Sequence, residues 1–454
     1  MSKETKNQRK PPSVVSLPVV HPHAAGIDVS ATMHVVAIPP DRPGETVKQF
    51  DAFTEDLEAL AQWLVANDIT TVAMESTGIY WKQLFLVLQQ HGLEVALVHA
   101  RQVKNVTGRK TDVSDAQWIQ KLHSCGLLNS CFLPDDATER LRSLVRHRKS
   151  LVEDSSKYVL RMQKALEMMN IKIQGVLSDI MGKTGTAIIE GILAGKREPA
   201  HFLPFIHPKV KADKETLLKS LTGNWREDQL FLLEENYRMH QHVEKHITIC
   251  EQKIETFLQK QLPDDDPLPL VTAPATCTPK KKKKKNKNEP AFDVGHYLYQ
   301  IHRVDVTEIY GISNSSALEI LSETGADLSK WETEDHFVSW LNLCPNNKIT
   351  GGKMISSKVM KKKAGIATQA FRTAANTLQR SDHWLGDYFR RMKAKGGNKY
   401  AIVATARKLA IIYYKMVRDK VPFTPMDKHL YRQQYKSAKI AYYEKQLIKL
   451  KAVA

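Results

Sequence analysis

The spacing of apolar residues over the first 130 positions predicts strands that alternate with helices. Residues 25–30 and 33–38 are rich in β-branched side chains, and residues 46–53 alternate between polar and apolar, so we expect three consecutive strands in an antiparallel meander. The next segments are expected to form, in order, a helix from Thr54, a strand at 70–75, a helix at 80–90 and a strand at 95–98. This order of elements is that of an RNase H-like sheet.

Two later segments have the pattern of long helices. Residues 136–169 and 228–262 carry apolar side chains at steps of three and four. Two such helices predict an antiparallel pair packed within one chain, with an intermolecular coiled coil as the alternative. The segment between them, 171–227, is expected to be an inserted subdomain, and its pattern does not indicate a shape.

A lysine-rich segment follows the second long helix. Residues 278–290 hold six consecutive lysines between two prolines, which predicts a disordered linker. The lysines either remain solvated or bind nucleic-acid phosphates. We therefore divide the chain into a disordered basic arm (1–22), an RNase H-like domain (23–134), a helical coiled-coil segment with an insertion (135–265), the linker (266–291), a C-terminal domain (292–425) and a helical tail (426–454).

The C-terminal domain is expected to be mainly helical. Residues 308–325 read as two short helices around a glycine turn, which resembles a helix-hairpin-helix, an element whose backbone amides suit phosphate contact. The segment W-L-N-L-C-P-N-N-K-I-T-G-G-K follows at 340–353, and helices are expected around 370–377 and 400–417. We expect nucleic acid to contact Lys353, Lys358, Lys361, Lys362 and Lys363.

The charge balance indicates a polyanionic partner. Lys and Arg number 67 against 49 Asp and Glu, a formal charge of +18, which favours nucleic acid first and an acidic membrane surface second. The five cysteines show no short metal or redox spacing. Because neither a signal peptide nor an apolar run of membrane-spanning length is present, we expect no membrane association and a location in a reducing cytoplasm.

Four carboxylates are expected to converge in the first domain. Asp28 lies on the first strand, Glu75 ends a later one, and Asp112 and Asp115 lie three residues apart at a helix start, on one face. Hard oxygen ligands of this kind can hold two Mg²⁺ ions for phosphoryl transfer. Singly, each acid has a structural alternative: Asp112 and Asp115 can cap a helix, Asp28 can serve a turn, and Glu75 can cap the following helix.

These residues carry a resemblance to a known family. G-I-D-V-S around Asp28, M-E-S-T-G-I-Y-W around Glu75, R-K-T-D-V-S-D-A around Asp112 and Asp115, and the later L-C-P-N-N-K-I-T-G-G-K resemble the DEDD-type insertion-sequence transposases, which are bridge-RNA-guided recombinases. The resemblance covers roughly 24–170 and 300–420. It implies a RuvC-like domain, a coiled-coil segment, a C-terminal transposase domain, Mg²⁺, double-stranded DNA as substrate, a non-coding guide RNA, and a dimer or tetramer in a bacterial or archaeal cell.

The resemblance also implies a hydroxyl nucleophile in the C-terminal domain. The family's serine corresponds, by spacing from Pro345, to Thr350 here. Threonine has the same hydroxyl, but its methyl group crowds attack and restricts χ1. Three readings follow: Thr350 is the nucleophile, Ser356 or Ser357 replaces it, or this copy is weakened. A flexible T-G-G-K turn that presents Lys353 to phosphate is the structural alternative.

Other functions remain possible from the sequence. A metal-dependent nuclease of the resolvase type would use water in place of the hydroxyl. An inactive nucleic-acid-binding descendant would retain the fold without the chemistry. An actin-like sugar kinase or ATPase also begins with a strand bearing G-x-D, but we find no second glycine-rich phosphate loop and no reason for the +18 charge.

Overall fold

A computed structural model of the chain describes residues 18–99, 103, 112–262, 288–359 and 365–451. The chain forms two compact units, which divide between Leu133 and Pro134. Most of the predicted N-terminal arm, the lysine run and the triplet at 361–363 lie outside the described residues. Within the described part of the chain, no helix is long and apolar enough to cross a bilayer.

The first unit is built on a five-stranded mixed sheet. Its strands are β1 (Ala24–Val29), β2 (Met33–Ala37), β3 (Val47–Asp51), β4 (Thr71–Glu75) and β5 (Glu94–Val98). Strand β2 pairs antiparallel with both β1 and β3, whereas the β1–β4 and β4–β5 pairs are parallel, so the order is β3-β2-β1-β4-β5. This topology is RNase H-like, and it confirms the fold predicted from the strand and helix order.

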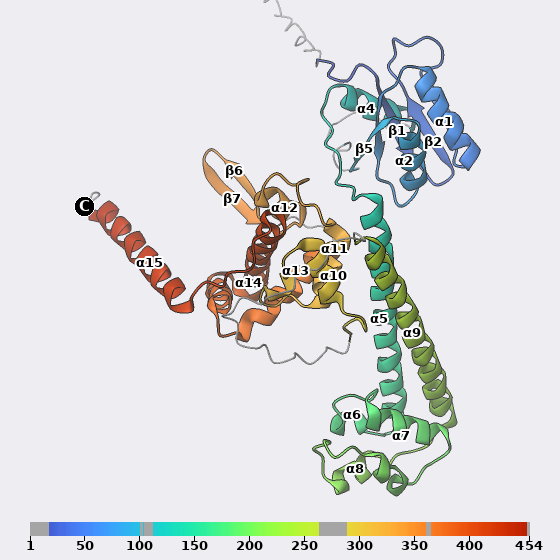
Figure 1. The fold of residues 1–454 in the computed structure, drawn as a ribbon, viewed down its shortest axis with the longest axis vertical. Helices are drawn as coiled ribbons and strands as arrows, with labels where there is room; N and C mark the ends of the chain where they lie inside the picture. Colours follow the sequence, from blue (N-terminus) through green and yellow to red (C-terminus); the bar gives the residue numbers. More distant parts are fainter. Residues whose placement is uncertain (1–17, 100–102, 104–111, 263–287, 360–364, 452–454) are drawn as a thin grey trace, which may run out of the picture. The chain divides into compact units, whose positions relative to one another are not determined.

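Helices cover both faces of this sheet (Figure 1). Helices α1 (Thr54–Ala66) and α2 (Trp81–Gln90) share a buried core with one face of the strands. Helix α4 (Asp112–Ser124) packs on the opposite face. Odd positions of β1, such as Ile27, point toward α1 and α2, so even positions point toward α4.

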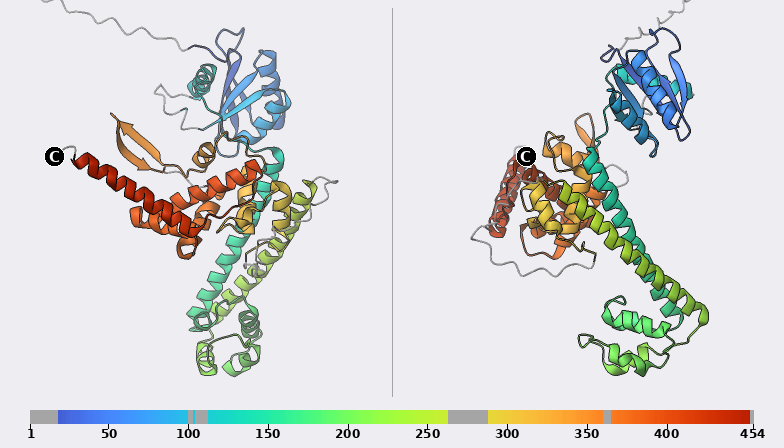
Figure 2. Two further views of the ribbon diagram at one scale, coloured as in Figure 1. Left: turned by 60° about the vertical axis from the view of Figure 1, so that its left-hand side comes forward. Right: turned by 45° about the vertical axis from the view of Figure 1, so that its right-hand side comes forward.

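The second unit begins with two long antiparallel helices. Helices α5 (Asp136–Met168) and α9 (Glu227–Lys260) lie side by side in every view (Figures 1 and 2). Arg148 forms a buried ion pair with Glu251 at 2.7 Å, and the Ser155 hydroxyl donates to Glu244 at 2.7 Å. Residue numbers in α9 therefore decrease along the contact as those in α5 increase, so the two helices run antiparallel. The two helices pack within one chain, as the first of the two sequence interpretations expected.

A small helical subdomain connects the far ends of α5 and α9. It contains α6 (Ile173–Val176), α7 (Lys183–Leu193), the 3-10 helix η1 (Pro199–Phe205) and α8 (Lys214–Ser220). Buried Phe202, Ile188 and Ile192 form its core together with Met162 of α5 and Leu233 of α9. The subdomain and the helix ends therefore share one hydrophobic core. The sequence indicated this insertion without its shape.

The C-terminal region packs against α5. Its first elements are α10 (Val294–His302), η2 (Val306–Glu308), α11 (Asn314–Thr324) and α12 (Glu334–Trp340). Glu323 at the end of α11 accepts hydrogen bonds from Arg146 of α5 at 2.8 and 2.9 Å. A backbone turn at Gly311, where φ is +87°, separates η2 from α11. Of the two short helices expected at 308–325, the second is present as α11, whereas the first is only the three-residue 3-10 helix η2, which ends at Glu308.

The remaining elements include a hairpin that the sequence did not predict. They are β6 (Asn346–Thr350), β7 (Lys353–Lys358), α13 (Ile366–Thr377), η3 (Leu378–Arg380), α14 (Trp384–Asp419) and α15 (Lys428–Lys451). Helix α14 is interrupted at Gly396 and Gly397, whose backbone is not helical. A hydrogen bond joins residues that precede and follow the lysine-rich segment: the Ala291 amide, after it, donates to Glu251 of α9, before it, at 2.8 Å. The residues that flank this segment thus belong to the same compact unit.

Candidate active site

Two carboxylates lie side by side at the carboxyl ends of β1 and β4. The parallel register aligns Ile27 with Met74, so the next step along both strands aligns Asp28 with Glu75. Neighbouring strands lie about 4.8 Å apart, so side chains at this level are direct neighbours. Both residues are half-buried, in contrast to the fully buried residues that precede them.

Both carboxylates project from the sheet face that α4 covers. Side chains two residues apart on a strand point the same way. Gly26, two residues before Asp28, faces the backbone of α4 directly. Ala73, two residues before Glu75, packs in one cluster with Ile119 of α4. The two acids and α4 are therefore on the same side of the sheet.

The direction of α4 brings its first turn toward the two acids. The Gln120 side chain donates to the carbonyl of the first residue of β1 at 3.2 Å, and His123 is hydrogen-bonded to Thr71, the first residue of β4, at 2.9 Å. The last turns of α4 thus lie over the strand beginnings. Its first turn, with Asp112 and Asp115, lies toward the strand ends.

The donor set of this site fits a divalent cation. Asp115 is half-buried, like Asp28 and Glu75, and all three offer the carboxylate oxygens that hard cations prefer. Asp112 starts α4, but its side chain lies outside the described part of the structure. Among the described side chains, no three His, Cys, Asp or Glu residues come close enough together to hold a metal ion. Convergence of all four acids therefore stays a prediction.

Thr350 lies at the tip of the β6–β7 hairpin. It is exposed, and it pairs with Lys353 across a two-residue turn formed by Gly351 and Gly352. Their φ angles are +54° and +73°, and a two-residue hairpin turn with two positive φ angles favours glycine strongly. The T-G-G-K motif is thus a two-residue turn of a β-hairpin.

The hairpin register sorts the candidate nucleophiles onto two faces. Lys348 and Thr350 lie two residues apart on β6 and so share a face; Thr350 pairs with Lys353 and Lys348 pairs with Ser356, with a register shift in the ladder between these two pairs. Ser357 lies on the other face, where its hydroxyl donates to Asn347 Oδ1 at 2.7 Å.

Sequence reasoning missed Lys348, because it shares a face with Thr350 only if residues 346–350 form a strand, and no strand was predicted there. The segment N-N-K-I-T has one apolar residue and no alternating pattern, so it gave no strand signal. Of the predicted nucleic-acid contacts, Lys353 is exposed at the turn, whereas the Lys358 side chain and Lys361, Lys362 and Lys363 lie outside the described residues.

Comparisons with known proteins identify the family. Residues 25–171 match a family model described as a transposase, of the DEDD and IS110 type, and residues 305–390 match the transposase IS116/IS110/IS902 family. The chain belongs to the IS110-type DEDD transposases. One solved structure, T. thermophilus RuvC in complex with a Holliday junction substrate, is similar to this transposase with 14% identity and a TM-score of 0.20, over 98% of that chain and 24% of this one. No curated protein matches the sequence.

The two family models cover both parts of the predicted site. The first contains Asp28, Glu75, Asp112 and Asp115, and the second contains the hairpin with Thr350. The transposase is thus an enzyme that acts on DNA, with an RNase H-like domain that carries the acids. The last 64 residues, from 391 onward, lie outside both matches.

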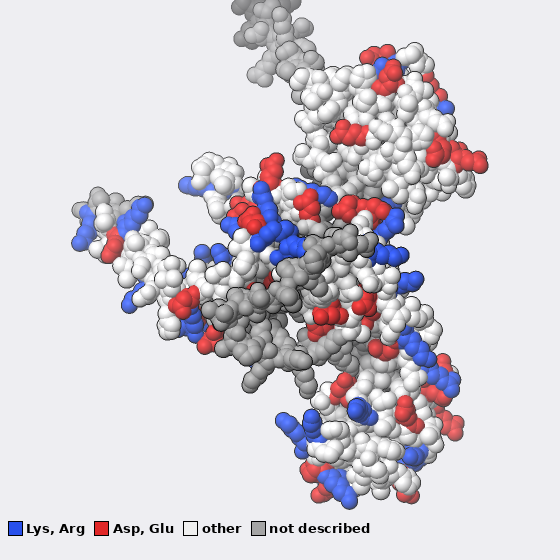
Figure 3. Space-filling view, in the orientation of Figure 1, with Lys and Arg blue, Asp and Glu red and all other residues white. Residues whose placement is uncertain are grey.

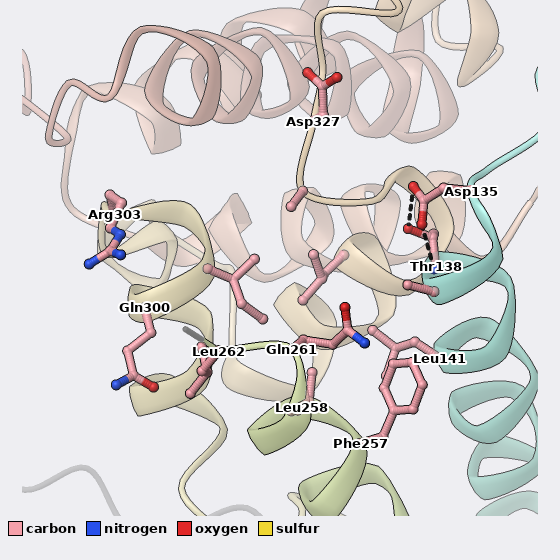
Figure 4. A pocket seen from close by; sticks show the side chains of 14 residues that line it. Asp135, Thr138, Leu141, Phe257, Leu258, Gln261, Leu262, Gln300, Arg303 and Asp327 are labelled. Atoms are coloured by element: carbon pink, nitrogen blue, oxygen red, sulfur yellow. Dashed lines mark hydrogen bonds between the residues drawn. The ribbon is translucent and has the colours of Figure 1, made fainter. Parts of the chain in front are cut away.

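Three pockets of the transposase are lined by residues of the second unit alone. A cavity of about 370 Å³ opens between α5, α9, α10 and α11, with Leu141, Phe257 and Leu258 along its wall (Figure 4). Asp135 lies at its edge as the N-cap of α5. Burial raises the pKa of this carboxyl, but hydrogen bonds from the Thr138 amide and hydroxyl hold the pKa below its ordinary value. This carboxylate is therefore a helix cap.

Proposed function

We propose that the transposase cleaves and rejoins DNA strands by attack of the Thr350 hydroxyl on a phosphodiester, assisted by Mg²⁺ at the acids of the first unit. The alignment of Asp28 with Glu75 on the α4 face carries this proposal, because two half-buried carboxylates at adjacent strand ends form the nucleus of a metal site. Asp112 and Asp115 would complete the ligand set from the first turn of α4.

The acids would hold the divalent ions and orient the phosphate between them. When bound, such ions lower the pKa of an attacking hydroxyl and offset charge on the phosphate oxygens. The carboxylates also repel a DNA phosphate, so the chain without metal should bind the scissile phosphate poorly. Asp28 and Glu75 sit on paired strands, which fixes the position of both relative to each other.

The hairpin face would supply the nucleophile and nearby positive charge. The Thr350 hydroxyl would give its proton to water, and its oxygen would form a bond to phosphorus as the bond from phosphorus to one strand oxygen breaks; the leaving oxygen would take a proton from water and depart as a hydroxyl. The DNA end then remains as a phosphothreonine ester, and attack by another strand hydroxyl would reverse the step and rejoin the DNA. Lys348 and Lys353, on the same face, would balance charge on the phosphate.

We further propose a non-coding RNA as guide and a dimer or tetramer as the active assembly. Both follow from the family resemblance and the +18 charge. Since the acids and Thr350 belong to different compact units, the units must come together on DNA, within one chain or between two.

The test looks for protein-linked DNA. The transposase, purified from its host with co-purifying RNA, is incubated with Mg²⁺ and end-labelled DNA carrying the element ends, and the products are separated on a denaturing gel. We expect a covalent adduct that Thr350→Ala and Asp28→Asn abolish and Thr350→Ser retains. Ser357→Ala should retain the adduct, because Ser357 lies on the opposite face of the same hairpin; an adduct lost in Ser357→Ala and kept in Thr350→Ala would make Ser357 the nucleophile.

Each other outcome assigns a different function. Cleavage without an adduct, unaffected by Thr350→Ala, would identify a hydrolytic nuclease in which water attacks. If Ser356→Ala abolishes the adduct and Thr350→Ala retains it, the nucleophile is Ser356. Bound RNA without cleavage would leave a nucleic-acid-binding descendant. Equal cleavage by the Asp28→Asn, Asp112→Asn and parent proteins would refute the metal site.

A further inference from the structure

Helix α15 is exposed on all of its sides beyond its first turns. From Arg432 to Ile448 every side chain is exposed except Gln446, which is half-buried, and even Ala438 and Ala441 are open to solvent. A helix packed on a protein surface hides at least one stripe of side chains. The described part of this helix hides no such stripe, so packing within its own unit does not account for it.

The base of α15 is nevertheless fixed. Arg432 forms an ion pair with Asp387 of α14 at 2.6 Å, and Lys428 pairs with Asp382. The Arg391 guanidinium lies 4.3 Å from the Tyr435 ring centroid. The first two turns thus attach the helix to α14, and the following 16 residues extend for about 24 Å.

The free part of α15 is strongly basic. The whole helix holds seven Lys and Arg residues and one acid, Glu444, whereas α9 holds four Lys and Arg and seven acids. Lys and Arg dominate the visible charge of α15 in Figure 3. Such a charge disfavours pairing with the same helix of a second copy, because like charges would meet along the contact.

Apolar side chains are distributed around α15. Ile440, Tyr443 and Leu447 lie within about 60° of one another on one side, whereas Tyr442 and Ile448 point about 160° and 80° away from Ile440. A helix that lies on a membrane separates apolar and basic faces. Apolar and basic side chains occur on every side of α15. This mixture suits a partner that encloses the helix and offers phosphates to the lysines and base edges to the apolar side chains.

We propose that the free part of α15 enters the major groove of double-stranded DNA, as a binding surface separate from the proposed cleavage site. The major groove of B-form DNA is about 12 Å wide and admits one helix, whereas the major groove of A-form RNA is too deep and narrow to admit side chains. The exposed lysines contact phosphates on both walls, and the tyrosine, isoleucine and leucine side chains contact sugars and thymine methyl groups. A length of 24 Å spans about seven base pairs.

Duplex binding at several salt concentrations tests this surface. The full chain is freed of bound nucleic acid in high salt and titrated into a labelled 30-base-pair duplex in EDTA. A variant with the four changes Lys436→Gln, Lys439→Gln, Lys445→Gln and Lys451→Gln should bind at least about tenfold more weakly at 0.15 M salt. Its slope of log Kd against log salt should decrease by about 0.9 for each lost phosphate contact. Gln resembles Lys in helix propensity, so the helix persists, and far-UV circular dichroism checks this.

Matched variants make the result specific. A control with Gln at exposed Lys214, Lys245, Lys253 and Lys260 loses the same charge and should bind the duplex within about twofold of the parent. Arg at the four α15 positions should preserve the slope. Because EDTA prevents metal-assisted cleavage, the outcome does not depend on the proposed function.

Three results would overturn the assignment. Equal loss of affinity in the α15 and control variants would mean that net charge alone binds DNA. Loss of binding to a single-stranded RNA with duplex binding intact would make α15 an RNA contact. A changed sedimentation coefficient with unchanged duplex binding would make it an interface between copies.

Discussion

Gly26 has no side chain, and this allows the backbone of α4 to approach the sheet closely. A Cβ atom on Gly26 would lie 2.5 Å from the Ala116 carbonyl oxygen and closer still to the Gln120 amide. These are backbone atoms that cannot rotate away. Because Asp28 is two residues further along β1, the same close contact sets the distance between that carboxylate and the acids at the start of α4.

Replacing Gly26 with Ala should therefore destabilise the first unit. Helix α4 would have to shift, and overpacking of this kind costs about 1–3 kcal/mol. Thermal unfolding of the variant should show the loss, and strand cleavage should fall further than stability explains. Gly175→Ala is the control, because a Cβ there meets nothing within 4 Å. Equal unfolding temperatures for both variants would contradict the close contact.

His123 should make the first unit sensitive to mild acid. Burial, and to a lesser extent the nearby His21, lowers the pKa of His123 to about 4, from an ordinary value of 6.5. Between these pH values the unfolded chain binds a proton that the folded chain does not, so stability is full above pH 6.5 and falls as pH drops toward 4. The decrease is at most about 1.4 kcal/mol per pH unit.

Denaturant unfolding at pH 7, 6, 5 and 4.5 measures this dependence. His123→Gln removes the titrating ring, and its stability should change less over the same range. Parallel curves for the variant and the parent would show that His123 does not contribute.

At the scale of elements, a buried ion pair joins α5, α9 and the start of the C-terminal region. Glu251 accepts hydrogen bonds from Arg148 at 2.9 Å and from the Ala291 amide at 2.8 Å, and Arg148 also donates to the carbonyl of Asn288 at 2.9 Å. Both charged side chains are about 90% buried. Three chain segments therefore depend on one carboxylate.

Removing this carboxylate should destabilise the second unit strongly. Glu251→Gln leaves the Arg148 guanidinium buried without its counter-charge, which costs about 3–5 kcal/mol. Chemical denaturation measures the loss. Glu234→Gln, which breaks a surface pair with Arg238 on the same helix, should cost about 1 kcal/mol or less. Similar losses in both variants would mean that the buried pair has no special role.

The accuracy of the sequence predictions differed between elements for physical reasons. Strands β1, β4 and helix α5 were predicted to within two residues, because their apolar periodicity is local. The β6–β7 hairpin was missed because its exposed strands carry no alternating apolar pattern. The two glycines adopt positive φ angles in a hairpin turn, but the sequence alone does not show that the flanking residues pair as strands. The positions of Asp28 and Glu75 on their strands were predictable, but the pairing of Thr350 with Lys353 and of Lys348 with Ser356 depends on register, which is not local.

At the scale of the whole molecule, the chemistry is divided between two compact units. The acids belong to residues 1–133 and the hydroxyl to residues 134–454. The first unit has its own core of 18 buried apolar residues around the sheet. A unit with its own core is expected to fold by itself.

Expression of residues 1–133 tests this independence. The fragment should unfold in one cooperative transition by calorimetry, and Gly26→Ala should lower its midpoint as it does in the full chain. By the proposed function, the fragment alone should form no adduct with DNA. An unfolded fragment by circular dichroism would show that the first unit needs the second.

The antiparallel α5–α9 pair has a consequence for how related chains can vary in length. The two helices contain 33 and 34 residues, so they hold the connecting subdomain about 50 Å from their other ends. Each inserted residue advances a helix by 1.5 Å and turns it by 100°. A single insertion in one helix would put the paired apolar positions out of phase, whereas seven residues added to both would lengthen the arm and keep its tip facing almost the same way. We therefore expect natural length variation in this arm to come in matched multiples of about seven residues, with the subdomain carried outward as a rigid cap.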